Sequence, residues 1–70
     1  MNLTAREIEV LKLVATGHSA EQAAKKLRLS KRTVEVHIRT ARLKLGATNA
    51  THAVVLALKQ KLFRLRDIES

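Results

Sequence analysis

The sequence contains no cysteine and no proline, only two glycines, and one aromatic residue, Phe63. Without cysteine, the chain can form neither a disulfide framework nor a thiolate metal site. It also has no stretch of about 18 apolar residues, the minimum for a membrane span. Met1 leads directly into a charged segment, without the apolar stretch of a signal peptide. We therefore expect a single small domain in the cytoplasm.

The residues that carry most enzymatic chemistry are also scarce. There is no cysteine nucleophile and no glycine-rich phosphate loop, and the one aspartate, Asp67, lies near the C-terminus. The three histidines, His18, His37 and His52, lack the i, i+4 spacing that would hold a metal ion on a helix. The sequence therefore predicts no enzymatic activity, no metal and no cofactor.

Acidic residues are few relative to basic ones. Fourteen Lys and Arg face six Asp and Glu, which gives a formal net charge of +8. Such an excess is typical of proteins that bind a polyanion, either nucleic acid or an anionic membrane surface. A membrane-surface helix would be one long amphipathic segment, often with tryptophan, whereas this chain is cut into short segments and has no tryptophan. The charge therefore favours nucleic acid.

Capping residues and glycines divide the chain into helices. Thr4 and Glu7 have the spacing of a capping box, and the same pattern recurs from Ser19. Gly17 and Gly46 follow apolar helical stripes, at positions where a helix commonly ends in the left-handed conformation. The pattern predicts a compact all-α, four-helix domain, with helices beginning after residues 4, 19 and 30 and at about 50, and ending near residues 16, 27, 45 and 61.

The second and third predicted helices are separated by a short turn at Arg28 and Leu29. This arrangement is typical of a helix-turn-helix. One side of the third helix is an apolar stripe, and the other side carries Arg32, Val36, Arg39 and Leu43.

A helix fits the major groove of DNA, where each base pair has a distinct pattern of donors and acceptors. Arg39 can donate two hydrogen bonds to a guanine, and Val36 can pack on a thymine methyl group. We expect phosphate contacts from Lys31, Arg32, Arg42 and the N–H groups near Ser30. An ordinary solvent-exposed basic face is the simpler alternative, and an acidic residue, Glu35, lies within it.

An ordered set of residues resembles the LuxR-type DNA-binding domain, which occurs in quorum-sensing regulators and in response regulators of the FixJ class. The resemblance covers residues 3 to about 63. The matching positions are Leu3, Thr4, Ala5, Arg6, Glu7, Ile8, Glu9, Val10, Leu11, Gly17, Ala24, Leu27, Leu29, Ser30, Thr33, Val34, Glu35, Val36, His37, Lys44, Leu45, Gly46, Ala47, Thr48 and Asn49.

The resemblance implies a transcription regulator whose third helix enters the major groove of double-stranded DNA. It implies contacts with DNA bases at Glu35, Val36 and Arg39, and contacts with the DNA backbone at Ser30, Thr33 and Lys44. It also implies that His37 points inward. Many members have a basic or neutral polar residue where Glu35 stands, so the preferred DNA sequence of this chain is left open.

The fourth predicted helix is apolar on two sides. Since a small domain can bury one side against its own core, the other side is free to contact a second copy. We expect a weak homodimer through Val54, Val55 and Leu58, in agreement with the pairing of fourth helices that the resemblance implies. Residues 1–63 then form the domain, and residues 64–70 either extend the fourth helix or fray.

The sequence therefore predicts a sequence-specific DNA-binding transcription regulator. The alternative is a degenerate helix-turn-helix that binds a protein, such as RNA polymerase, with little or no specific DNA binding.

Overall fold

The computed structural model describes residues 2–68 of the chain, with the side chains of residues 65 and 68 excepted. Four helices follow one another as predicted: α1 (Ala5–Ala15), α2 (Ala20–Leu27), α3 (Lys31–Leu45) and α4 (Ala50–Lys59). A one-turn helix, α5 (Leu65–Ile68), comes after them. No strand occurs within residues 2–68. The predicted all-α fold with a helix-turn-helix is confirmed.

The predicted capping boxes are present at the starts of the first two helices. The Thr4 side chain accepts from the Glu7 N–H, and the Glu7 carboxylate accepts from the Thr4 N–H at 2.8 Å. Ser19 and Gln22 make the same reciprocal pair at α2. These bonds satisfy N–H groups that have no partner within the helix, which explains why α1 and α2 begin where the sequence indicated.

Only two of the four longer helices end at glycine. Gly17 and Gly46 have positive φ, as expected, but so do Arg28 after α2 and Lys61 after α4. The Leu29 N–H donates to the Ala24 carbonyl at 2.9 Å, the same backbone pattern that glycine usually allows. The hydrogen bonds of this turn and the packing of Leu29 hold Arg28 in the left-handed backbone conformation, which residues with a side chain usually avoid.

The end of α4 differs from the prediction. The helix stops at Lys59, and the chain turns through Lys61 instead of continuing to residue 61 and beyond. The turn is closed by a hydrogen bond of 2.9 Å from the Leu62 N–H to the Ala57 carbonyl. It directs Phe63 into the core, where 3% of the residue's surface remains exposed. Residues 64–68 therefore do not extend α4, and α5 packs against α1. Residues 69–70 of the predicted tail lie outside the described part.

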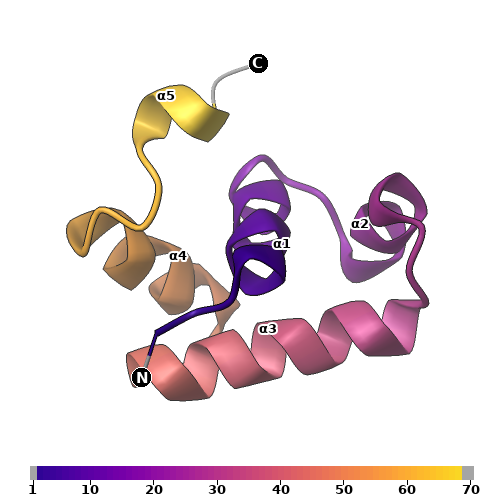
Figure 1. Cartoon of the computed structure of the whole chain (residues 1–70), viewed down its shortest axis with the longest axis horizontal. Helices are drawn as coiled ribbons and strands as arrows, with labels where there is room; N and C mark the ends of the chain where they lie inside the picture. The colour runs from indigo at the N-terminus through magenta and orange to yellow at the C-terminus, as the bar shows by residue number, and fades with distance from the viewer. Residues whose placement is uncertain (1, 69–70) are drawn as a thin grey trace.

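The core consists of two apolar clusters that share α1 and α3. Val10 and Val34 pack with Ala23 and Ala24 of α2. At the other end, Leu11 packs with residues of α3, α4 and the segments that follow them, namely Ala41, Ala47, Ala53, Ala57 and Phe63. Figure 1 shows the result: α3 runs along one edge of the molecule, and α1, α2 and α4 all lie on the same side of it. The opposite side of α3 carries Arg32, Val36, Arg39 and Leu43, all of which are exposed.

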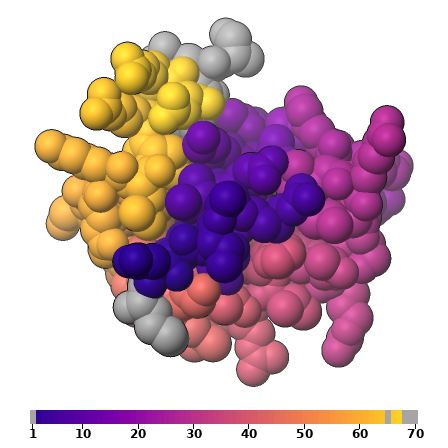
Figure 2. Space-filling model, viewed as in Figure 1, coloured from indigo at the N-terminus to yellow at the C-terminus, as the bar shows by residue number. Residues whose placement is uncertain are grey.

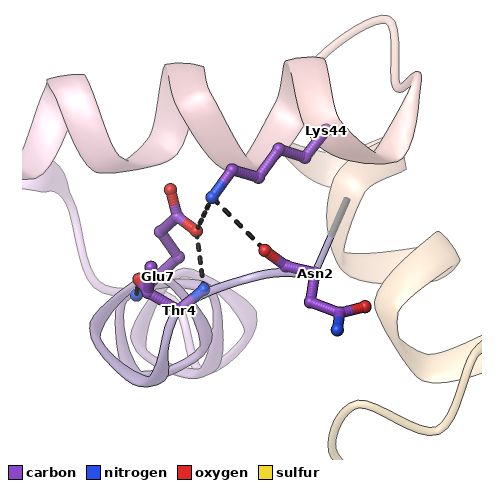
Figure 3. A network of polar contacts seen from close by, with 4 residues as sticks. All are labelled: Asn2, Thr4, Glu7 and Lys44. Atoms are coloured by element: carbon purple, nitrogen blue, oxygen red, sulfur yellow. Dashed lines mark hydrogen bonds and ion pairs between the residues drawn. The ribbon is translucent and has the colours of Figure 1, made fainter.

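An ion pair joins the start of α1 to the end of α3 (Figure 3). The Lys44 Nζ lies 2.9 Å from the Glu7 Oε1 and 3.3 Å from the carbonyl oxygen of Asn2. The Glu7 side chain is 4% exposed and that of Lys44 is 16% exposed. Burial raises the pKa of Glu7, but the hydrogen bonds from Thr4 and Lys44, with the positive charge of Lys44, lower the pKa by more. The pKa therefore lies below its ordinary value of 4.5.

We predict that Glu7→Gln lowers the free energy of unfolding by about 2 kcal/mol at neutral pH, because it leaves a half-buried ammonium group without its counter-charge. In the wild type, the stabilisation from a lowered carboxyl pKa is complete above pH 4.5 and is lost as the pH falls through the lower pKa of the folded state. The difference between the variant and the wild type should therefore shrink in acid.

Urea unfolding followed by circular dichroism at several pH values measures this difference. Glu9→Gln is the matched control, since Glu9 is an exposed carboxylate on the same helix. Equal effects of the two substitutions would show that the Glu7–Lys44 pair contributes nothing to stability.

Candidate nucleic-acid interface

The turn between α2 and α3 fixes the start of the candidate interface. Leu29 is half-buried and packs against the cluster of Val10 and Val34, which anchors the turn to the core. Ser30 then caps α3: its Oγ accepts from the Thr33 N–H at 3.0 Å and lies 2.8 Å from the Thr33 Oγ1. Because one hydroxyl proton suffices for the bond between these two side chains, the other hydroxyl can donate to an external acceptor such as a phosphate.

The N-terminal two-thirds of α3 carries most of the predicted site residues. Thr33 is half-buried, and the others in this stretch are exposed: Ser30, Lys31, Arg32, Glu35, Val36 and Arg39. At 100° per residue, Arg32, Val36 and Arg39 share one side of the helix, opposite the buried Val34 and Ala41. In Figure 2, side chains of the α3 region project from the lower edge of the molecule, away from α1.

Two predicted phosphate contacts come from the C-terminal third of α3, and both side chains are already engaged. The Arg42 Nη1 donates to the Ala47 carbonyl at 3.3 Å, just beyond the end of the helix. The Lys44 ammonium is held by Glu7 and the Asn2 carbonyl (Figure 3). The family resemblance implied a contact between Lys44 and the DNA backbone, and no sequence pattern indicated its ion pair with a residue 37 positions away. Lys44 therefore joins α3 to α1 within the domain.

His37 is half-buried, consistent with the prediction that it lies at the edge of the apolar stripe. The predicted dimer residues on α4 differ among themselves. Val55 is 47% exposed, whereas Val54 and Leu58 are half-buried and pack partly against the core. The open apolar surface of α4 is thus centred on Val55 and is smaller than the sequence suggested.

Within residues 2–68, no group of three or more His, Cys, Asp or Glu residues could hold a metal ion. None of the helices described is long and apolar enough to cross a membrane.

Comparison with known proteins identifies the class. Residues 1–57 match the family model of bacterial regulatory proteins of the luxR family. The chain is 47% identical over 60 residues to the transcriptional activator protein BjaR1 of Bradyrhizobium diazoefficiens. It is 42% identical over 60 residues to the oxygen regulatory protein NreC of Staphylococcus aureus. Each alignment covers 86% of this chain but only 25% and 28% of the relative, respectively.

Two solved structures have folds similar to that of this chain. The response regulator ChrA of a heme-sensing two-component system superposes with a TM-score of 0.85 and 41% identity, over 90% of this chain and 31% of that one. VqmA bound to DPO superposes with a TM-score of 0.78 and 30% identity, over 99% of this chain and 36% of that one. The chain belongs to the luxR family and is its helix-turn-helix DNA-binding domain, a regulatory and non-enzymatic unit. It spans about a quarter of the curated relatives' length.

We predict that Glu35→Lys changes DNA binding through charge. Glu35 is exposed among cations, and in the described part of the chain it belongs to neither of the two ion pairs, Lys25–Glu21 and Lys44–Glu7. Near phosphates, replacement by lysine should tighten binding to DNA of mixed sequence and steepen the dependence of log K on log salt by about one unit. If Glu35 instead accepts from a cytosine amine, the same change should weaken the preferred site.

Fluorescence anisotropy at several salt concentrations measures both quantities. Glu9→Lys makes the same charge change at an exposed position of α1. If the two variants behave alike, Glu35 lies outside the interface.

Proposed function

We propose that α3 is the recognition helix of this domain and enters the major groove of a specific DNA site in the bacterial cytoplasm. The observation that carries this proposal is the open side of α3, where Arg32, Val36 and Arg39 are exposed together and the other long helices all pack on the opposite side. The arrangement allows the helix to approach the base edges without a clash from α1, α2 or α4.

The proposed base contacts come from the middle of α3. Arg39 lies near the middle of the open side, where its guanidinium group can donate two hydrogen bonds to the O6 and N7 of a guanine. Val36 is one turn before it and offers an apolar surface to a thymine methyl group. Glu35 lies beside Arg39 and can accept from a cytosine amine. These three residues supply the sequence specificity.

Positioning comes from the N-terminal end of α3. Lys31 and Arg32 are exposed there, and the first N–H groups of a helix have no acceptor within it. Together with the Ser30 and Thr33 hydroxyls, they form a surface suited to phosphate oxygens. Arg42 lies on the flank of α3 and contributes charge near the groove wall, while its hydrogen bond to Ala47 is kept.

We further propose that two copies bind a two-fold site through contact of their α4 helices around Val55. A second recognition helix about one DNA turn away doubles the set of contacts. Because Val54 and Leu58 are partly covered by the domain's own core, the shared surface is small, and we expect the pair to form mainly on DNA. RNA polymerase is a further proposed partner.

We predict that Arg39→Ala costs about 1–3 kcal/mol of binding free energy at the preferred site and relaxes the preference at one base position. Since Arg39 is exposed, helicity and the melting temperature should change little. The preferred site is first selected from random duplexes, and binding is then measured against it. Lys59→Ala is the control, because it removes an exposed cation from α4 instead of α3. If the two variants bind equally well, α3 is not the recognition helix.

We predict that Val55→Glu leaves a folded monomer that still binds a single half-site. It should lose the added affinity for a two-fold site whose half-sites are about ten base pairs apart, because a carboxylate cannot be buried cheaply between two copies. Gln60→Glu adds the same charge just after α4 and should keep the affinity for the two-fold site. Sedimentation on DNA, with circular dichroism, separates loss of pairing from unfolding. Unfolding of Val55→Glu would assign Val55 to the core.

A further inference from the structure

The open side of α3 carries a large apolar side chain that the contacts described so far do not use. Leu43 is 61% exposed, more than the other two exposed large hydrophobic residues of the described chain, Val36 at 51% and Val55 at 47%. It belongs to neither of the two core clusters. Leu43 is therefore not needed for the packing of the domain.

The position of Leu43 relates it to the proposed recognition residues. It lies four residues after Arg39 and seven after Val36, and at these separations helical side chains share one side. The rise of about 1.5 Å per residue places Leu43 about 10 Å from Val36 along the axis of α3, with Arg39 between them. Ten ångströms corresponds to about three base pairs of DNA.

The whole length of α3 can approach one groove. Every other long helix packs on the opposite side of α3, so the C-terminal half of its open side is as accessible as the N-terminal half (Figure 1). An end-on approach would leave Leu43 in solvent, whereas a lengthwise approach brings it to the groove. Val36 and Leu43 are both exposed on the open side of α3, and this favours the lengthwise approach.

The occupant of this apolar position follows from the surroundings. Leu43 lies on a helix with five lysine and arginine residues, on a chain of net charge +8, which favours a polyanion over an apolar protein surface. The major groove displays one strongly apolar group, the C5 methyl of thymine. We propose that Leu43 packs on the C5 methyl of a thymine about three base pairs from the base that Val36 contacts. The proposal rests on the proposed function of α3.

The test removes the methyl group and nothing else. In the site selected by the wild-type 70-residue chain, each thymine is replaced in turn by uracil. Loss of one buried methyl contact corresponds to about a fourfold loss of affinity. We expect two sensitive positions about three base pairs apart. Leu43→Ala should abolish the sensitivity at one of them and leave the other unchanged, while Val36→Ala should do the reverse. At the thymine whose uracil effect Leu43→Ala abolishes, 5-methylcytosine and cytosine can also be compared. The duplex with 5-methylcytosine, which carries the same methyl group, should be bound more tightly than the duplex with cytosine.

Controls keep a failure of this proposal distinct from a failure of the proposed function. Lys59→Ala changes an exposed residue of α4 and should keep both uracil effects. Leu43→Met keeps an apolar side chain of similar size and should retain the effect at its position. Equal uracil sensitivity in Leu43→Ala and the wild type, or a uniform loss of affinity on all duplexes, overturns the assignment of Leu43 alone. If Arg39→Ala also binds normally, the assignment of α3 itself fails.

Discussion

The packing of α1 across the middle of α3 is the constraint on which the rest of the structure depends. Val10 and Leu11 are neighbours in sequence and fully buried, yet they belong to different clusters, one shared with α2 and the other with α4. Because both clusters use the same side of α3, none of the helices within residues 2–68 covers the other side. The packing of this small core therefore explains why one side of α3 is open, whichever residues lie on that side.

The composition of the core explains why the Glu7–Lys44 pair matters. Six of the ten buried hydrophobic residues in the described chain are alanine, so the helices approach closely but each contact buries little apolar surface. A buried ion pair usually gains little over apolar packing. Here, however, Glu7 also caps α1, and Lys44 also binds the Asn2 carbonyl. One pair of side chains therefore fixes both the start of α1 and its position on α3.

Much of the fold could be predicted from local signals. The caps at Thr4, Ser19 and Ser30 and the two glycines act through neighbouring backbone groups, so their effect is visible in the sequence. The end of α4 was not predictable in this way. Lys61 adopts a positive φ because Phe63 gains burial once the chain turns, and that burial depends on residues from α1, α3 and α4. The exposed residues of α3 were placed correctly by helical periodicity, whereas the engagement of Lys44 by Glu7 required knowledge of the tertiary fold.

The distribution of chemistry along α3 suggests how affinity and specificity are divided. Lys31, Arg32 and the first N–H groups of the helix lie at its N-terminal end, and contacts of such groups with phosphates would not depend on DNA sequence and would weaken as salt increases. Toward the C-terminal end, Arg42 and Lys44 are drawn into hydrogen bonds with the domain itself, and the exposed residue between them is Leu43. The apolar contact proposed for Leu43 would be insensitive to salt and would depend on a methyl group at one base. In the proposed mode of binding, the first turn of α3 therefore contacts the phosphate backbone, and the residues from Glu35 to Leu43 discriminate between bases.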